Sequence, residues 1–263
     1  MIIDGHAHVI LPVERHLTLM DAAGVERTIL FSTRIHPERA DNFDALEEEL
    51  RILDEVLAGN RNNTINVYRR ATAELAQVVQ TYPECFTGFG SLPLSLTRDD
   101  AETWIREEVV AHGFRGLGEF TLAPGQIAQL EVVFELAGEF GNLPIWVHTL
   151  APLRLEDIQE LVALSRRYMH VPLILGHLGG LHWRDTLRLA KENPQTYLDL
   201  SAVFTILAPA MAIRELPERT LFSSDAPYGS PLVARTIVEQ ATGSREIRER
   251  VLGGTIAQLL HID

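Results

Sequence analysis

The stretch Met1-Ile2-Ile3-Asp4-Gly5-His6-Ala7-His8 opens the chain with an apolar, alternating run that rises into two histidines one residue apart. In a β-strand, residues i and i+2 point to the same face about 6.5–7 Å apart. The imidazoles of His6 and His8 can therefore reach one metal ion from a single strand. Because an H-x-H pair also arises by chance, this stretch alone leaves a metal site and a metal-free strand end equally open.

Three later segments repeat the arrangement of an apolar strand that ends in a metal-ligating side chain. Residues 144–148 and 172–177 are short apolar runs that end in His148 and His177, and residues 220–225 end in Asp225. Imidazole nitrogen and carboxylate oxygen are both common metal ligands in proteins. Four strand ends therefore offer ligands, which favours the metal-site interpretation of the first stretch.

The rest of the chain alternates strands and helices around these segments. Apolar residues at helical spacing predict a helix over Val13–Ala23 that ends at Gly24, and Thr28–Ser32 is typical of a parallel strand buried on both faces. The alternation continues through eight strand/helix units, the pattern of an α/β protein. A length of 263 residues agrees with the usual size of a (β/α)8 TIM barrel, about 250 residues. We therefore predict one barrel domain over residues 1–263.

One segment after the second strand departs from this alternation. Between Arg34 and Asn63 the chain carries its own acidic helix, Asp44–Leu57, followed by the polar stretch Gly59–Asn63, before a helix over Thr64–Tyr82 returns to the barrel. The acidic helix is interpreted as a solvated excursion with a charged outer face. Its place after a strand end also makes it a candidate cover over a site, because long loops usually have a function.

Composition and charge exclude several classes of protein. The net charge of −13 argues against nucleic acid as a partner, because binding a phosphate backbone needs clustered Lys and Arg. The single cysteine, Cys85, excludes an intramolecular disulfide. Neither a signal peptide nor an apolar run approaching 18 residues is recognised, so we expect a cytoplasmic protein that does not span a membrane and acts on a small molecule. The oligomeric state stays open, with a homo-oligomer as one alternative.

The candidate ligands share one position in the predicted barrel. The carboxyl ends of the strands meet at one face, where barrel enzymes build their active sites. Nitrogen and oxygen donors together suit zinc first and manganese or iron next. Such an ion lowers the pKa of bound water towards about 7, and Asp225 is a candidate base, ligand or both. The residues at or just past the strand ends are His6, His8, Glu119, His148, His177 and Asp225.

Three motifs make the sequence similar to the amidohydrolase-related (amidohydrolase-2) branch of the amidohydrolase superfamily. They are Ile3–His8, Ile174–Gly180 and Leu221–Gly229, and the resemblance extends to Val251–Ala257, where the family often has Asn and this chain has Thr255. The resemblance implies a TIM barrel with a metal site at its mouth. It also implies a hydrolase, a decarboxylase or a hydratase, and leaves the substrate undetermined.

The role of Glu119 decides the number of metal ions. Its position after strand four resembles the deoxyribonuclease-like barrels, in which a glutamate bridges two ions, and this implies a bridging or direct ligand here. The alternative is a carboxylate that only holds a histidine ring. One ion would then be bound by His6, His8, His148 and Asp225, with His177 near the water.

Four further residues are candidates for a role at the site. Arg34 and His36 follow strand two, where a guanidinium can clamp a substrate carboxylate or pair with the acidic excursion. Tyr228 follows strand eight, in the place of an aromatic pocket wall. Asp4 shares the face of His6, so it either orients a ligand or anchors strand one through backbone bonds.

The main hypothesis is a metal-dependent hydrolase whose activated water attacks a small ester, lactone or amide, with Asp225 and His177 as catalytic groups. The nearest alternative is a nonoxidative decarboxylase or hydratase of an unsaturated or aromatic acid on the same site. A metal-binding barrel without turnover is a third interpretation. A nuclease, implied by the Glu119 resemblance, is disfavoured by the acidic balance of the chain.

Overall fold

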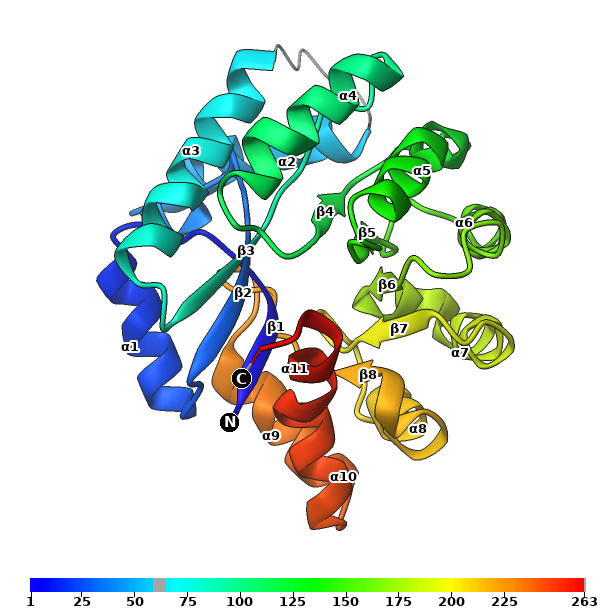
Figure 1. Cartoon of the computed structure of the whole chain (residues 1–263). Helices are drawn as coiled ribbons and strands as arrows, with labels where there is room; N and C mark the ends of the chain where they lie inside the picture. The colour runs from blue at the N-terminus through cyan, green and yellow to red at the C-terminus, as the bar shows by residue number, and fades with distance from the viewer. Residues whose placement is uncertain (59–64, 263) are drawn as a thin grey trace.

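The computed structural model describes residues 1–58 and 65–262 of the chain. The predicted polar stretch at 59–63 and the predicted helix start at Thr64 lie outside the described residues. Within the described part, eight parallel strands alternate with helices around a common centre, as Figure 1 shows. The strands are β1 (Ile3–His8), β2 (Arg27–Phe31), β3 (Phe86–Phe89), β4 (Leu117–Phe120), β5 (Ile145–His148), β6 (Leu173–Gly176), β7 (Thr196–Asp199) and β8 (Thr220–Leu221).

The strands pair in two runs, β1-β2-β3 and β4-β5-β6-β7-β8, and backbone hydrogen bonds join the runs at one end. Gly90, just past β3, donates its N–H to the carbonyl of Gly116 at 3.0 Å, and Gly118 on β4 donates to the carbonyl of Gly90 at 2.8 Å. A parallel bridge between Gly90 and Leu117 completes this seam.

The second seam joins the first strand to the segment that follows the last one. Gly5 donates to the carbonyl of Phe222 at 2.9 Å, and His8 donates to the carbonyl of Ala226 at 2.7 Å. In return, the N–H of Asp225 donates to the carbonyl of His6 at 2.7 Å. The two seams close the strands into the predicted (β/α)8 barrel.

Helices surround the strands in Figure 1, and the predicted boundaries of the first, Val13–Ala23, are confirmed to the residue. The helices are α1 (Val13–Ala23), α2 (Phe43–Leu57), α3 (Ile65–Thr81), α4 (Arg98–Trp104), α5 (Glu131–Glu139), α6 (Leu155–Ser165), α7 (Trp183–Glu192), α8 (Leu207–Glu215), α9 (Pro231–Ala241), α10 (Arg245–Glu249) and α11 (Thr255–Leu260). π-Helical turns over Ile105–Val110 and Arg250–Gly254 extend α4 and α10, and short 3-10 turns cover Pro37–Arg39, Ile127–Leu130, His177–His182 and Pro217–Arg219.

Local chemistry explains several of these boundaries. Gly24 ends α1 in the left-handed region at φ 61°, a conformation that is easiest for glycine. The side chain of Asn42 accepts the N–H of Ala45 at 2.9 Å and so caps α2. Thr97 caps α4 by accepting the N–H of Asp100 at 3.3 Å. The excursion helix is present as predicted, and none of its residues is buried.

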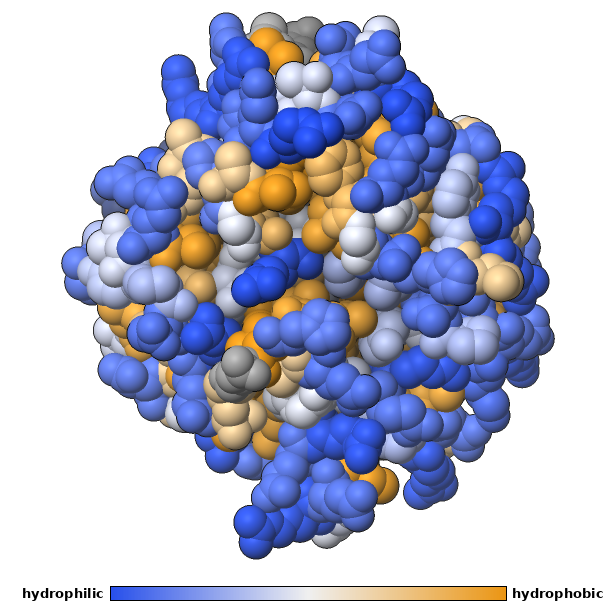
Figure 2. Space-filling model, viewed as in Figure 1, coloured by the Kyte–Doolittle hydropathy of each residue, from blue (hydrophilic) through white to orange (hydrophobic). Residues whose placement is uncertain are grey.

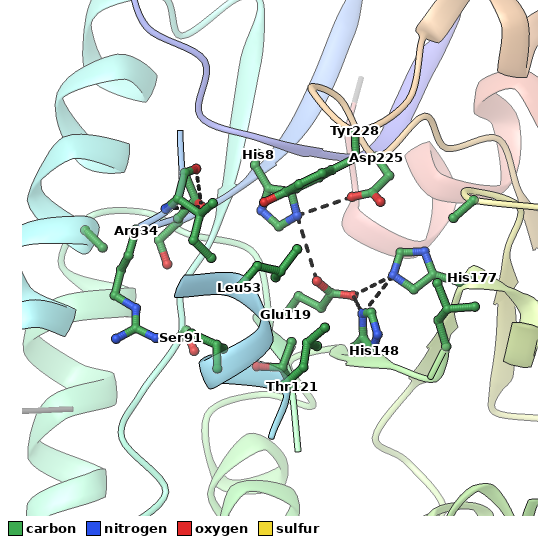
Figure 3. A pocket seen from close by; sticks show the side chains of 18 of the residues that line it. His8, Arg34, Leu53, Ser91, Glu119, Thr121, His148, His177, Asp225 and Tyr228 are labelled. Carbon is green, nitrogen blue, oxygen red and sulfur yellow. Dashed lines mark hydrogen bonds and ion pairs between the residues drawn. The ribbon is translucent and has the colours of Figure 1, made fainter. Parts of the chain in front are cut away.

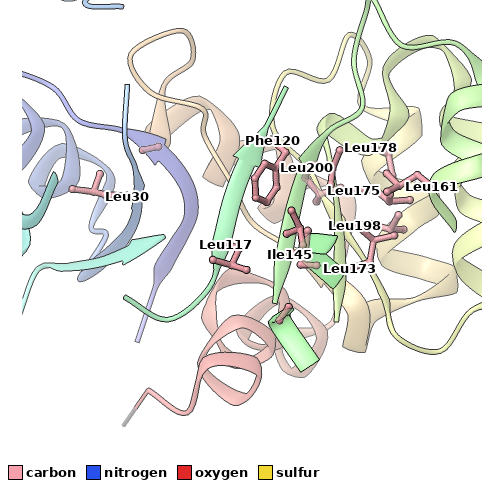
Figure 4. Packing of buried hydrophobic residues seen from close by; sticks show 14 of the residues in the cluster. Leu30, Leu117, Phe120, Ile145, Leu161, Leu173, Leu175, Leu178, Leu198 and Leu200 are labelled. Atoms are coloured by element: carbon pink, nitrogen blue, oxygen red, sulfur yellow. The ribbon is translucent and has the colours of Figure 1, made fainter. Parts of the chain in front are cut away.

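The core has two layers that follow the alternation of side chains along each strand. On β6, Ile174 packs inside the barrel with Ile3, Phe89 and Trp146. Its neighbours in the sequence point outwards into the larger layer between strands and helices, where Figure 4 shows leucine side chains meeting the helices. The outer layer includes Leu117, Ile145, Leu173, Leu175 and Leu198.

The two ends of the barrel are covered differently. Ile256 and Leu260 of α11 pack into the inner layer, so α11 closes the end at which the strands begin. The opposite end is open to the cavity described below. Strand eight is shorter than predicted: β8 ends at Leu221, and Asp225 lies four residues later in the left-handed region at φ 59°. Among the described helices, none has the length and apolar character needed to cross a bilayer.

Candidate metal centre

Six side chains from five different strand ends converge at the open end of the barrel. Figure 3 shows five of them facing one point, with Glu119 at the centre. His6, on β1, lies beneath them and is fully buried. The side chains brought together are His6 and His8 of β1, Glu119 of β4, His148 of β5, His177 just past β6 and Asp225 past β8.

One group of ligand atoms surrounds Oε2 of Glu119. Nε2 of His6 lies 3.6 Å from this oxygen and 3.8 Å from Oδ1 of Asp225. Nε2 of His8 lies 3.9 Å from the same Glu119 oxygen and 3.3 Å from Oδ1 of Asp225. Ligands placed about 2.0–2.2 Å from one cation are separated by about 3–4 Å, so these four atoms have the spacing of a coordination sphere.

A second group surrounds the other oxygen of Glu119. Nδ1 of His148 lies 3.3 Å from Oε1, and Nε2 of His177 lies 3.2 Å from it. The two ring nitrogens are themselves 3.0 Å apart. The carboxylate of Glu119 therefore lies between two sets of imidazoles, with one oxygen directed to each set (Figure 3).

Three buried polar atoms in this cluster have no hydrogen-bond partner among the described residues: Nε2 of His6, Nδ1 of His8 and Oε1 of Glu119. A buried polar atom without a partner costs roughly 1–3 kcal/mol, and such atoms need an explanation. Two of the three, on His6 and Glu119, are directed at other ligand-type atoms of the cluster. The residues present therefore fit divalent cations with mixed nitrogen and oxygen coordination, such as zinc, manganese or iron.

Electrostatics keep the carboxylates of the cluster ionised. Burial opposes the charge of Glu119, but the charge of His6 and the adjacent imidazoles of His148 and His177 outweigh it and hold the pKa of Glu119 well below its usual range. For Asp225 burial is likewise outweighed, chiefly by the hydrogen bond from His8, and its pKa is lowered. Both groups are therefore anionic and able to ligate at neutral pH.

An outer layer of hydrogen bonds fixes two of the imidazoles. The residues that form it were not among those predicted from the sequence. Oδ2 of Asp199 lies 2.8 Å from Nδ1 of His6 and accepts the indole N–H of Trp146 at 3.2 Å. Oγ of Ser201 lies 2.8 Å from Nδ1 of His177. Such outer contacts orient metal-ligating rings. A usable signal was present, since Asp199 is a lone charge on an otherwise uncharged strand and lies at the same end as the predicted ligands.

Asp4 anchors β1 through hydrogen bonds, and within the described residues none of these bonds goes to a side chain of the candidate metal site. Its Oδ1 accepts the backbone N–H groups of Ser224 at 2.9 Å and of His6 at 3.2 Å, and its Oδ2 accepts the hydroxyl of Ser224. These bonds tie β1 to the segment after β8. Of the two interpretations of Asp4, the structure supports the anchor.

A cavity of about 330 Å³ opens above the cluster. Its floor carries His8, Glu119, His148, His177 and Asp225, and Figure 3 shows Leu53 of α2 across from them. The wall formed by α2 and α3 consists of Leu53, Val56, Leu57, Tyr68 and Ala71. The excursion therefore covers the site, as its position in the sequence allowed.

The three predicted substrate-binding residues lie in different places. Arg34 and Tyr228 line the cavity, and the ring of Tyr228 meets that of His8 edge to face at 5.8 Å. His36 instead turns to the excursion, with Nδ1 3.0 Å from Glu38 and Nε2 3.3 Å from Glu74. The hydrogen bonds that the ring of His36 donates to these carboxylates raise its pKa to about 9. The contacts of His36 therefore hold the excursion in place.

Comparison with solved structures shows the same fold in several enzymes. A 5-carboxyvanillate decarboxylase from Sphingomonas paucimobilis is 16% identical at a TM-score of 0.71, with 100% of this chain and 99% of the other covered. A dihydroxybenzoic acid decarboxylase from Polaromonas, solved with manganese and 2-nitroresorcinol, is 20% identical at 0.70, with 99% and 97% covered. A 4-oxalomesaconate hydratase from Rhodopseudomonas palustris is 17% identical at 0.63, with 99% and 96% covered.

A search of curated protein sequences finds no match to this chain. The family model described as amidohydrolase matches residues 3–262. Because that match spans nearly the whole chain, family membership argues against the interpretation as a barrel without turnover. The chain belongs to the amidohydrolase family and is an enzyme.

Proposed function

We propose that this enzyme is a metal-dependent hydrolase that holds two divalent cations with Glu119 between them. One observation carries the proposal: the two oxygens of Glu119 face separate sets of ring nitrogens, His6 and His8 on one side and His148 and His177 on the other. Zinc is the preferred ion, with manganese and iron as alternatives. When bound, such cations lower the pKa of water towards about 7 and polarise a substrate carbonyl.

Asp225 is the proposed proton carrier. Its carboxylate lines the cavity and is kept ionised by contact with His8, so it can accept a proton from the attacking water and return it to the leaving group. His177 has its Nδ1 held by Ser201, which directs Nε2 towards Glu119 and the reacting centre. The phenol of Tyr228 stays protonated, because burial and the charge of Asp225 raise its pKa, and it can donate a hydrogen bond to substrate.

The cavity defines the substrate as a small molecule with an apolar body. Its volume of about 330 Å³ lies at the lower end for ligand pockets, roughly 300–1,000 Å³. Leu53, Val56 and Leu57 supply an apolar wall, and Arg34 contributes a positive charge. An ester, lactone or amide that carries a carboxylate away from the scissile bond suits this lining.

A nonoxidative decarboxylase or hydratase is the second candidate. The fold is shared with decarboxylases and a hydratase, and Arg34 together with the apolar wall also suits an aromatic or unsaturated acid. Under this alternative the same residues would hold the cations, and Asp225 would deliver a proton to carbon in place of moving one from water.

Product analysis separates the two candidates. Purified enzyme with its metal content measured is incubated with ester, lactone and amide panels and, in parallel, with aromatic and dicarboxylic acids. Hydrolysis that is lost with a chelator, restored by zinc and abolished in Asp225→Asn supports the proposal. Release of carbon dioxide without addition of water would replace it with the decarboxylase.

A further inference from the structure

A second cavity lies at the opposite end of the barrel from the metal centre. It measures about 430 Å³ and is bordered by the starts of β7 and β8 and by α11, which lies towards the viewer in Figure 1. Figure 2 shows that this face of the molecule is mostly hydrophilic, with apolar residues gathered near its centre. The polar residues of the cavity used below are Gln195, Tyr197, Glu218, Arg219, Arg250 and Gln258.

Arg219 is held rigidly at the edge of this cavity. Its Nη1 donates to the carbonyls of Ala190 at 2.7 Å, Asn193 at 2.8 Å and Thr196 at 3.3 Å. These acceptors are neutral, so they fix the guanidinium without cancelling its charge, and the carboxylate of the exposed Glu218 acts on it without forming an ion pair. The hydrogen bonds of Arg219 within the described residues all use Nη1, so Nε and Nη2 remain for another acceptor.

Tyr197 adds a neutral donor beside this cation. Its ring packs against the inner layer of the barrel core, and Tyr197 also lines the cavity. Burial raises the pKa of Tyr197 against the opposing charge of Arg219, so the hydroxyl keeps its proton. A protonated phenol next to a fixed guanidinium is a pair of hydrogen-bond donors suited to an oxyanion.

The charges around the cavity are unusual for this protein. Acidic residues outnumber basic ones by 36 to 23, and most arginines on the helices pair with a glutamate or an aspartate. Arg219 and Arg250 line one cavity, yet neither forms an ion pair within the part of the chain that the structure describes. The carboxylate in the lining belongs to Glu218, which is exposed.

We propose that this cavity binds a small organic anion, a phosphate or a carboxylate, between Arg219, Arg250 and the hydroxyl of Tyr197. The side-chain amides of Gln195 and Gln258 supply further donors around it, and Pro172 and Leu259 give it an apolar side. Its volume exceeds that of an inorganic phosphate and falls within the range of small-molecule pockets, about 300–1,000 Å³. The ligand therefore carries an organic part next to its anionic group.

Calorimetric titration tests the proposal with two probes, inorganic phosphate and succinate. Both are titrated at constant ionic strength into metal-loaded enzyme and again after chelation, because an anion bound to the metal centre is lost with the metal. One equivalent that survives chelation is expected. The tighter of the two probes identifies the anionic group of the ligand.

Two variants and one matched control locate the binding. Arg250→Gln removes a charge-assisted hydrogen bond and weakens binding about tenfold, and Tyr197→Phe weakens it by a smaller factor. Arg214→Gln, an exposed arginine of α8 away from the cavity, leaves binding unchanged. Arg219 is kept, because its substitution would break the three backbone contacts.

Crystals soaked in selenate give a direct readout, with anomalous density expected beside Arg219 and Tyr197. The proposal is overturned if neither probe binds chelated protein, if Arg250→Gln and Tyr197→Phe bind as tightly as the natural chain, or if selenate occupies only other positions.

Discussion

The imidazole of His6 and the carboxylate of Asp199 lie 2.8 Å apart although 193 positions separate them in the sequence. The carboxylate holds Nδ1, which leaves Nε2 directed at Glu119 and Asp225. Burial raises the pKa of Asp199, but the hydrogen bond with His6 outweighs it and lowers the value to about 2. The metal-facing nitrogen of His6 is therefore oriented by a permanent negative charge.

Removing that charge should weaken metal binding without unfolding the protein. Asp199→Asn keeps the shape of the side chain but loses the charge, and we expect metal affinity to fall by about 10–100-fold. Competition with a fluorescent chelator measures the change. Asp185→Asn, on the exposed side of α7, is the control and should bind metal normally. Equal affinity in both variants would contradict the orienting role of Asp199.

Glu119 should determine the number of ions. In Glu119→Gln one carboxylate oxygen becomes an amide nitrogen, which cannot ligate, so we expect the metal content to fall from two ions per chain to no more than one. Turnover should fall on the order of 100-fold or more, because charge stabilisation at the reacting carbonyl is lost. Elemental analysis of the purified variant gives the count. Retention of two ions would rule out the bridging role.

Arg34 should discriminate among substrates by charge. Arg34→Gln removes the guanidinium from the cavity wall, and we expect KM for acidic substrates to rise about tenfold with kcat little changed. Neutral esters of the same size should be hydrolysed as before. Arg51→Gln, on the exposed face of α2, is the matched control. An equal loss of activity with acidic and neutral substrates would instead assign Arg34 a structural role in holding the excursion.

Because of His16, the free energy of unfolding should fall as the pH is lowered. This histidine of α1 is buried against Phe86, with ring centres 5.2 Å apart, and its Nε2 has no hydrogen-bond partner among the described residues. Burial lowers its pKa to about 4 against the opposing charge of Glu38. Below its unfolded pKa of about 6.5, the unfolded chain binds a proton that the folded chain does not, so stability is lost as the pH falls.

The size of this effect is about 2 kcal/mol between pH 7.5 and pH 5. Urea unfolding of the chelated natural chain and of His16→Gln at both pH values isolates it, because the other histidines are common to both proteins. The natural chain should lose more stability than the variant. An equal loss would show that His16 titrates normally in the folded state.

The parts of this fold that the sequence predicts best are those set by local patterns. Helix α1 follows from apolar spacing and from Gly24, and the strand ends follow from short apolar runs that terminate in a polar ligand. The predicted end of β8 was wrong by four residues: residues 222–224 are as apolar or small as a strand and stay bonded to β1, but the regular strand stops at Leu221. Contacts between distant segments, such as His6 with Asp199 or His36 with Glu74, depend on packing that no local pattern encodes.

The seam between the start and the end of the barrel also has a consequence for biosynthesis. The backbone of Asp225 bonds to that of His6, and Ser224 bonds to Asp4 across 220 positions, so the last ligand arrives only when the final strand docks on the first. A nascent chain on the ribosome carries His6 and His8 long before Asp225 is translated. Metallation of the complete centre must therefore follow translation of Asp225 and closure of the barrel, and translation products that stop before Asp225 would lack it.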